Sequence, residues 1–318
     1  MKGESAILAY ALRRLIALVP VLLFVSFVTF GMVRLAPGDP VLIVLGGKRV
    51  DPATMDVLRH QFGLVGDPIS QYVAWLGRAL QGDLGESYRL RQDVVSLIAD
   101  RLPLTLQLVG LAMLIAVAVA IPLGVIQAHR RNSVIDYAGS LLALIGLSSP
   151  VYFSAIIGVL VFAVGLGWLP AFGSGSDPLD QLRHLILPAV AMALGTIALT
   201  SRMTRSAMLE ALSSDYIEAA RAKGLPERTI LVKHALRNAL IPVVTVTSLQ
   251  VGFLLVGSVL VETTLGLGGL GSLITDAIQN RDYPVIQASV LLLTVAFSLL
   301  NLFTDLVYGM IDPRIRYG

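Results

Sequence analysis

Six long apolar runs limit what this chain can fold into more than any other feature of its sequence. About 20 predominantly apolar residues are needed for a helix to cross the hydrocarbon core of a bilayer. Runs that meet this length occur at 11–34, 104–128, 134–166, 185–206, 239–262 and 285–309. Only 14% of the 318 residues are charged, whereas soluble domains contain about 25%. The sequence therefore predicts an all-α integral membrane protein with six transmembrane helices.

The third of these runs is too long for one straight crossing. Gly146 and Ser148-Ser149-Pro150 interrupt it, and a proline inside a helix removes a hydrogen bond and clashes with the preceding turn. We therefore expect a kink or a break near Pro150. Dividing the run into two crossings would move the later loops to the opposite side of the membrane, so the charges of the loops must decide the topology.

The distribution of basic residues predicts the orientation, because short loops rich in Lys and Arg stay in the cytoplasm. With six crossings, the short loops on one side contain only Arg183 and Arg281. Both termini and the loop 207–238 are therefore predicted to be cytoplasmic. The basic residues on that side are Lys2, Arg13, Arg14, Arg130, Arg131, Arg202, Arg205, Arg221, Lys223, Arg228, Lys233, Arg237, Arg314 and Arg316.

Four regions follow from this topology. Residues 1–35 hold the cytoplasmic N-terminus and the first helix, whose apolar run exceeds the core of a signal peptide and is read as an uncleaved span. Residues 36–103 form an extracytoplasmic region with amphipathic stretches near 53–62, 69–81 and 93–101. Residues 104–310 form a five-helix core, and residues 311–318 form a cytoplasmic tail.

The polar, basic segment between the fourth and fifth runs predicts a short helix over residues 216–223. Asp215 can cap a helix that begins at Tyr216, and the Glu218 carboxylate can then reach back to the cap amide. Gly224 suits a left-handed helix end, and Pro226 can begin the next helix. The predicted helix has about two turns and a length of about 12 Å.

Alanine at positions 219, 220 and 222 leaves the surface of this short helix low, so a partner could approach it closely. Glu218-Ala219-Ala220, followed after three residues by Gly224, resembles the EAA motif of the membrane subunits of bacterial ATP-driven (ABC) importers. The continuation from His234 to Pro242 is similar to the branch of that family that imports peptides, nickel and related solutes. Further similar segments extend the resemblance over nearly the whole chain: 35–40, 82–85, 102–106, 281–287 and 311–316.

The resemblance implies a type I ABC importer permease fold with an extracytoplasmic insertion after the first helix, in the bacterial cytoplasmic (inner) membrane. It implies that the cytoplasmic loop is a coupling helix that docks in a groove of an ATPase subunit. It also implies four kinds of partner: a homologous second permease subunit, two ATP-binding-cassette ATPases, an extracytoplasmic solute-binding protein and the lipid bilayer. ATP and Mg would be bound by the ATPases, so this chain would need no cofactor. The implied coupling residues are Asp215, Tyr216, Ile217, Glu218, Ala219, Ala220, Ala222 and Gly224.

Several interpretations stay open. The implied solutes are dipeptides and oligopeptides, while nickel chelates, glutathione or another small solute are alternatives. A stand-alone secondary transporter is less favoured, because the sequence shows no obvious repeat and no titratable group near the midplane of a span. The region 36–103 is either a surface that contacts the solute-binding protein or a structural cap over the helices.

Polar residues within the apolar runs are candidates for the translocation path, because a polar side chain that faces lipid is costly. Gln250 lies near the middle of the fifth run. Thr294, Ser298, Asn301 and Asp305 follow at spacings of three or four in the sixth, which places them on one helix face. We predict that Gln250, Thr294, Ser298 and Asn301 border the path. Hydrogen bonding between helices is the competing explanation, and Asp305 could pair with an arginine of a loop.

No catalytic or metal site is predicted. Gly47-Lys48 lacks the spacing of a phosphate-binding loop, and the segment with Gly266, Gly268 and Gly271 matches G-x-G-x-x-G after a membrane span instead of a strand. We read those glycines as a tight turn into a short helix near 271–280. The chain has no cysteine, and the net charge of +3 is spread over membrane-flanking loops, which does not indicate nucleic-acid binding. The four histidines form no ligand cluster: His60, His129, His184 and His234.

Overall fold

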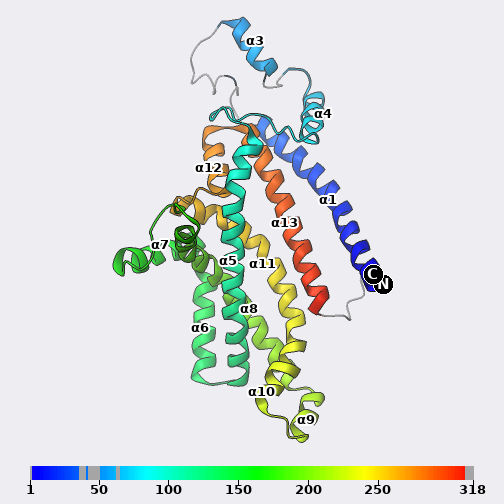
Figure 1. The fold of residues 1–318 in the computed structure, drawn as a ribbon, viewed down its shortest axis with the longest axis vertical. Helices are drawn as coiled ribbons and strands as arrows, with labels where there is room; N and C mark the ends of the chain where they lie inside the picture. Colours follow the sequence, from blue (N-terminus) through cyan, green and yellow to red (C-terminus); the bar gives the residue numbers. More distant parts are fainter. Residues whose placement is uncertain (1, 36–40, 42–50, 62–64, 312–318) are drawn as a thin grey trace.

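A computed structural model describes residues 2–35, 41, 51–61 and 65–311 (Figure 1). Over these ranges the protein is helical and has no β-strand, and one isolated antiparallel bridge joins Glu86 to Asp93. The expected all-α class is therefore confirmed. The helices are α1 (Lys2–Leu35), α3 (Pro52–Gln61), α4 (Pro68–Ala79), α5 (Val94–His129), α6 (Val134–Ser148), α7 (Val151–Gly158), α8 (Pro178–Leu212), α9 (Asp215–Ala222), α10 (Glu227–Thr229), α11 (Leu236–Leu265), α12 (Leu270–Asn280) and α13 (Tyr283–Ile311), with π-helical segments at Val159–Gly165 and Ile230–Ala235.

Five helical segments of the described chain are long and apolar enough to cross a bilayer. A sixth crossing is obtained if α6 and the segment Val151–Gly165 are counted as one bent span, since they meet at an angle of 108°. The predicted break is confirmed, because α6 ends at Ser148 and Pro150 precedes α7 with an extended backbone. The five unbroken segments are Leu12–Met32, Val94–His129, Pro178–Leu212, Glu227–Leu265 and Tyr283–Phe303.

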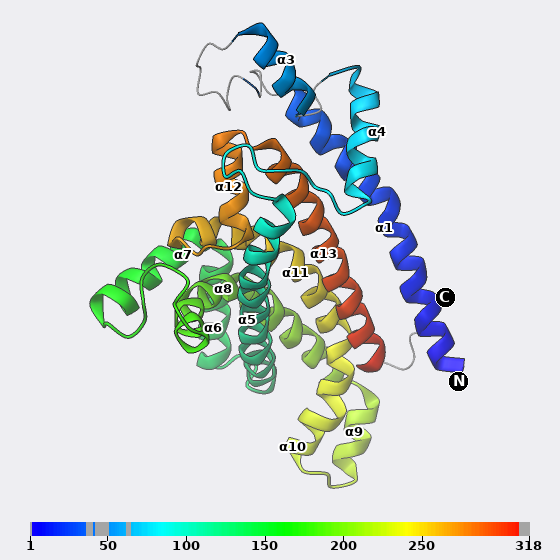
Figure 2. The ribbon, with the colours of Figure 1, turned by 45° about the horizontal axis from the view of Figure 1, so that its top comes forward.

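The long helices form a bundle whose two ends carry different short helices. In Figure 1, α5, α8, α11 and α13 run along the length of the molecule, α6 lies beside α5, and α7 projects sideways. One end carries α9 and α10, and is called the α9 end below. The opposite end carries α12, with α3 and α4 beyond it, and is called the α12 end (Figure 2). The outermost long helix, α1, packs against α13.

The start of α5 differs from the expectation that a separate amphipathic stretch would occupy 93–101. Asp93 caps α5, with its carboxylate accepting a hydrogen bond of 2.8 Å from the backbone N–H of Ser96. The helix then continues through Pro103 into the second apolar run. Its first turns bury apolar side chains against α12 and α13, and this packing outweighs the cost of the internal proline. The stretches near 53–62 and 69–81 correspond to α3 and α4.

The most extensive contact between two helices of the described bundle is that of α5 with α8. Both helices contribute alanines and larger apolar side chains to the main core, among them Leu108 and Ala189. Gly124 of α5 lies directly against α8: a Cβ atom at this position would be 2.5 Å from the Cβ of Thr204 and 2.7 Å from the carbonyl oxygen of Ser201. The approach of the two backbones therefore depends on the absence of a side chain at position 124.

We expect Gly124→Ala to destabilise the protein by about 1–3 kcal/mol, because the added methyl group overpacks a rigid backbone contact. Gly110→Ala is a matched control in the same helix, since nothing lies within 4 Å of its added Cβ. That change is expected to be neutral or stabilising by up to about 1 kcal/mol through helix propensity. Thermal unfolding of the detergent-solubilised variants measures both effects, and equal unfolding temperatures would contradict the packing argument.

Candidate functional site

The short helix α9, which follows α8 and precedes α10 in the chain, protrudes from one end of the bundle (Figure 1). It begins one residue earlier than predicted. Ser214, with an extended backbone, occupies the cap position, and Asp215 is the first helical residue. The predicted cap by Asp215 is therefore wrong, and no side-chain hydrogen bond caps this helix. The reason is local: the Ser214 hydroxyl donates instead to the carbonyl of Ala211, at the end of α8.

The shifted start also removes the predicted reciprocal contact between Glu218 and the cap amide. Glu218 is the fourth residue of α9, and its side chain is exposed. Asp215 and Glu218 nevertheless both lie near the N-terminus of the helix, where negative charge interacts favourably with the helix dipole.

The end of α9 follows the prediction. Gly224 has a φ of +73°, which is the left-handed conformation that glycine adopts without a steric penalty. The backbone N–H of Leu225 donates to the carbonyl of Ala220 at 3.3 Å, and that of Gly224 donates to Arg221 at 2.9 Å. This pair of hydrogen bonds is the Schellman helix end. Pro226 then precedes α10 as its cap residue, and the chain turns back toward the bundle.

The two faces of α9 differ in what they contact. Ile217 and Ala220 are buried, at 0% and 7% exposure, and they pack into an apolar cluster at the α9 end. The remaining predicted coupling residues are exposed and form the outward surface of the loop. The buried members of the cluster, called the α9 cluster, are Ala128, Ala207, Met208, Ile217, Ala220, Ile230, Ala235 and Ala239. The exposed residues are Asp215, Tyr216, Glu218, Ala219, Ala222 and Gly224.

Polar contacts also connect α9 to α10 and to the start of α11. The amide nitrogen of Asn238 donates to the hydroxyl of Tyr216 at 2.8 Å. Arg221 forms a 2.9 Å ion pair with Glu227, and this hydrogen-bonded carboxylate raises the pKa of the Arg221 guanidinium. Since both members of that pair are about half exposed, the pair contributes little to stability. The apolar cluster and the Tyr216–Asn238 bond therefore connect α9 to α8 and α11.

A buried ion pair lies near the α9 end of the bundle, between α6 and α8. The carboxylate of Asp136 accepts hydrogen bonds from Nε and Nη2 of Arg205 at 2.6 and 2.7 Å. The backbone N–H of Asn132 donates to the same carboxylate at 3.0 Å. The side chain of Asp136 is 3% exposed and that of Arg205 is 29% exposed. This pair fixes the turn between α5 and α6 to the helix that leads into α9.

The candidate path residues lie on two neighbouring helices, α11 and α13. Gln250 is buried in α11, whereas Thr294, Ser298 and Asn301 are half-buried in α13. The hydroxyls of Thr294 and Ser298 donate to carbonyls of their own helix at 2.8 and 2.9 Å. No hydrogen bond joins Gln250 to these three described residues. The side chain of Asp305 lies outside the described part of the structure, so its predicted ion pair stays a prediction.

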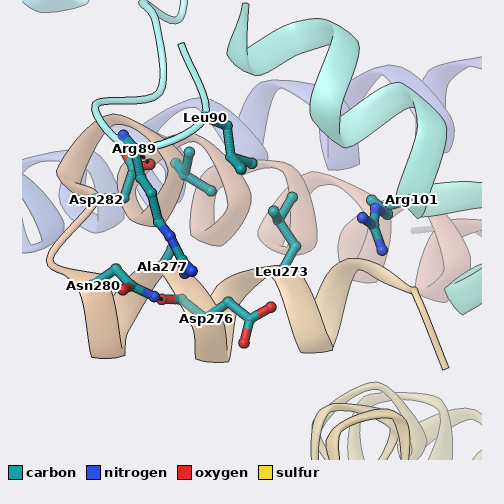
Figure 3. Close-up of a pocket in the computed structure, with 9 residues that line it drawn as sticks. Arg89, Leu90, Arg101, Leu273, Asp276, Ala277, Asn280 and Asp282 are labelled. Atoms are coloured by element: carbon teal, nitrogen blue, oxygen red, sulfur yellow. Dashed lines mark hydrogen bonds between the residues drawn. The ribbon is translucent and has the colours of Figure 1, made fainter. Parts of the chain in front are cut away.

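At the α12 end, Asp282 holds a loop against the start of α13. Its carboxylate accepts hydrogen bonds from the hydroxyl of Ser87 and from the backbone N–H groups of Tyr88 and Arg89. A pocket lies between this loop, the start of α5, and α12 (Figure 3). Charged and polar side chains of both signs line it beside apolar ones: Arg89, Leu90, Arg101, Leu273, Asp276, Ala277, Asn280, Asp282 and Val285.

The glycine-rich segment between α11 and α12 surrounds a buried carboxylate. Gly266, with a φ of +64°, ends α11, and α12 begins at Leu270, which confirms the predicted tight turn into a short helix. Glu262 is fully buried in the last turn of α11. It accepts hydrogen bonds from the Thr105 hydroxyl at 2.7 Å and from the backbone N–H of Gly271 at 2.7 Å. The segment follows helix α11, whereas a dinucleotide-binding loop follows a β-strand. This agrees with the prediction that the glycines do not form a dinucleotide site.

The comparison with known families agrees with this architecture. The family described as "Binding-protein-dependent transport system inner membrane component" matches residues 120–317. The corresponding N-terminal family, "Binding-prot-dependent transport system membrane comp, N-term", matches residues 7–109. The chain belongs to this family of ABC importer permeases. The resemblance inferred from the EAA motif is therefore confirmed.

Named relatives of the permease cover nearly its whole length. It is 40% identical to the dipeptide transport system permease protein DppB of Alkalihalophilus pseudofirmus, over 98% of this chain and 100% of that protein. It is 41% identical to the di/tripeptide transport system permease protein DppB of Pseudomonas aeruginosa, over 98% of this chain and 99% of that protein. Both comparisons span residues 36–103 as well as the helical core.

Solved structures confirm the type I importer permease fold. Two inward-facing crystal forms of the MetNI methionine ABC transporter match with TM-scores of 0.55 and 0.57, each at 21% sequence identity. These matches cover 69% and 68% of the permease and 97% and 96% of the MetNI chains. At this identity they show the fold alone.

Sequence reasoning missed three buried polar junctions of the permease. Asp136 is an acid at the start of an apolar run, and Glu262 is an acid at the end of one. Intramembrane acids are costly without partners, so their positions were a signal that partners exist. The partners are Arg205 for Asp136 and Thr105 for Glu262, which lie 69 and 157 residues away in the chain. The spacing of residues in the sequence could not identify them. Asp282 likewise contacts Ser87 across 195 residues.

Proposed function

We propose that this chain is the transmembrane permease subunit of an ATP-driven importer of dipeptides and oligopeptides. The single observation that carries the proposal is the geometry of α9. Its inner face is locked to α8 and α11 by Ile217 and Ala220, while Ala219 and Ala222 leave its outer face low and exposed. The names of the two DppB relatives support peptides as the solute.

The proposed mechanism is alternating access driven from the α9 end. Two partner ATPases bind ATP and Mg. One ATPase binds α9 of this chain, and the other binds the equivalent helix of a homologous second permease subunit. Closure of the two ATPases brings the two helices together. This chain supplies no catalytic group. Moving a two-state equilibrium from 1:99 to 99:1 takes about 5.5 kcal/mol of differential binding. Because Ile217 and Ala220 are buried against α8 and the base of α11, a push on α9 acts on both spans.

The proposed orientation places the α9 end and both termini in the cytoplasm of a bacterial inner membrane. The basic residues predicted to be cytoplasmic support it, since Arg205, Arg221 and Lys223 belong to α8, α9 and the loop after it. The α12 end and residues 36–103 then face outward. A solute-binding protein would deliver solute to this end.

We further propose that Gln250, Thr294, Ser298 and Asn301 border the translocation path. Gln250 supports this role because it is a buried polar residue of α11, the helix that begins beside α9. The chain has no cysteine of its own, so Gln250→Cys gives a clean probe. We expect a water-soluble maleimide to label it in at least one nucleotide state. Absence of labelling in every nucleotide state would remove Gln250 from the path.

Reconstitution tests the proposed function directly. The permease is purified with its partner chains, placed in liposomes with the binding protein and ATP, and assayed for uptake of a radiolabelled dipeptide. We expect ATP-dependent uptake and co-purification of ATP-hydrolysing chains. Nickel chelates and glutathione serve as competing solutes. Purification without any ATPase, or uptake that follows an ion gradient and ignores ATP, would overturn the proposal.

A further inference from the structure

We propose that Glu262 is a positioning residue that joins α11, α12 and α5 into one moving body. Through this junction, movement delivered to α9 would reach the α12 end of the permease. The inference rests on the proposed function, because it concerns the transmission of movement from the coupling loop. It assigns a role to a buried carboxylate that neither the coupling surface nor the solute path uses.

The hydrogen bonds of Glu262 connect all three helices. One carboxylate oxygen accepts from the Thr105 hydroxyl of α5 at 2.7 Å. The other accepts from the backbone N–H groups of Gly271 and Ser272 of α12, at 2.7 and 3.2 Å. Thr105 in turn accepts a hydrogen bond of 2.9 Å from the backbone N–H of Leu270. The side chain of Glu262 therefore joins α11 directly to both α5 and α12.

The carboxylate also performs the capping that α12 lacks. Gly269 stands at the cap position of α12 and offers no side chain to the first backbone N–H groups. Glu262 accepts hydrogen bonds from two of them from the preceding helix, those of Gly271 and Ser272. The start of α12 is therefore held by a residue of α11 instead of one of its own.

Glycines at positions 269 and 271 allow this close contact, because a side chain at either position would collide with its neighbours. A Cβ atom at Gly271 would be 2.9 Å from a Glu262 carboxylate oxygen and 2.5 Å from the Cα of Val259 in α11. Gly269 lies against the same carboxylate and the Thr105 hydroxyl. Because the backbone of α12 rests directly on α11 at these points, a shift of α11 displaces α12.

After the turn that follows α9, the chain from α10 to Glu262 is one continuous helical segment. Residues Glu227–Leu265 have no break, and at 1.5 Å per residue they extend about 58 Å. The Tyr216–Asn238 hydrogen bond ties α9 to this segment near its beginning, and Glu262 lies near its end. Immediately after α12, Asp282 holds the loop at residues 87–89. The connection therefore runs from α9 through α11 and α12 to an outer loop.

The experiment compares two substitutions that break the junction with two that preserve it. Glu262→Met keeps the length of the side chain but leaves the α12 amides without an acceptor, and Thr105→Val keeps the shape but removes the hydroxyl. Glu262→Gln keeps one oxygen for the amides and an NH₂ group that can donate to Thr105. Thr105→Ser keeps the hydroxyl. All four are made in the full complex with its partner chains.

Two readouts separate transmission from simple stability. Spin labels on Leu260→Cys of α11 and Gln279→Cys of α12, both exposed positions, report the distance between the helices with and without ATP. We expect one narrow distance in the wild type, Glu262→Gln and Thr105→Ser. In Glu262→Met and Thr105→Val we expect a broad, nucleotide-dependent distribution. The solute transported per ATP should fall about tenfold in these two variants, because each loses hydrogen bonds of the buried junction.

The outcomes distinguish this inference from the proposed function. If Glu262→Met does not assemble, Thr105→Val still gives both readouts. Assembled disrupting variants that keep the wild-type distance and the wild-type ratio of solute to ATP would overturn the role of Glu262. Failure of the wild-type complex to transport any solute would count against the proposed function, while the distance measurement would still report on the junction.

Discussion

Replacing Gly224 with valine is expected to lower ATP-driven uptake by about tenfold, because a non-glycine residue in the left-handed conformation costs about 1–2 kcal/mol and a β-branched one more. Gly224 ends α9 with a φ of +73°. Valine at this position favours a different backbone conformation, which would break the two hydrogen bonds that close the helix at Ala220 and Arg221. The orientation of α9 relative to α10 would then be lost.

A side chain at position 224 has space, so the effect of the valine substitution reports on the backbone conformation and not on a steric clash. Nothing lies within 4 Å of a Cβ atom built at Gly224. Gly224→Asn is therefore the matched control, because asparagine tolerates the left-handed region far better than valine does. We expect it to retain most of the uptake. Both variants are assayed in proteoliposomes for uptake and for ATP hydrolysis.

The expected signature of the valine variant is uncoupling. ATP hydrolysis continues in the assembled complex while solute uptake falls, since the change alters the coupling loop and not the bundle. Normal uptake by Gly224→Val, or an equal loss in Gly224→Asn, would contradict the role assigned to the helix end. The amount of complex recovered from the membrane is measured alongside, because a general folding defect would lower both variants.

Replacing Asp136 with alanine is expected to destabilise the permease by about 3 kcal/mol, because it leaves the guanidinium of Arg205 without its partner inside the protein. The change also removes the acceptor for the backbone N–H of Asn132. Arg205 is 29% exposed, so water offsets part of the cost. The unfolding temperature of the detergent-solubilised protein should fall by roughly 5 °C.

The double variant Asp136→Leu with Arg205→Met is the control for this prediction. It removes both charges and fills the site with apolar groups, which often costs little when a buried pair is replaced as a whole. We expect its unfolding temperature to lie closer to that of the wild type than to that of Asp136→Ala. A double variant that is as unstable as the single one would show that the ion pair itself stabilises the fold.

Local patterns were enough to predict most of the helices. Apolar length predicted the long spans, Pro150 predicted the broken one, and Gly224 predicted a left-handed helix end. The glycines from Gly266 to Gly271 predicted a tight turn into a short helix. These features depend on residues that are neighbours in the chain. The sequence predicted Asp215 as the cap of α9, whereas Ser214 occupies that position in the structure. The hydroxyl of Ser214 donates to the end of α8, a contact that the local pattern did not predict. The start of α5 was missed because packing against α12 extends the helix across Pro103.

The sequence by itself determined the class of the protein, the positions of its spans and the family to which it belongs. Each of these depends on composition, on helical periodicity or on a short motif such as Glu218-Ala219-Ala220. Only the tertiary structure decided which face of α9 is free and which groups form hydrogen bonds with the carboxyl groups of Asp136 and Glu262. The physical reason is that a buried polar group must form hydrogen bonds with whichever groups the fold brings within about 3 Å of it. In this permease those groups come from different helices, 69 and 157 residues away in the chain.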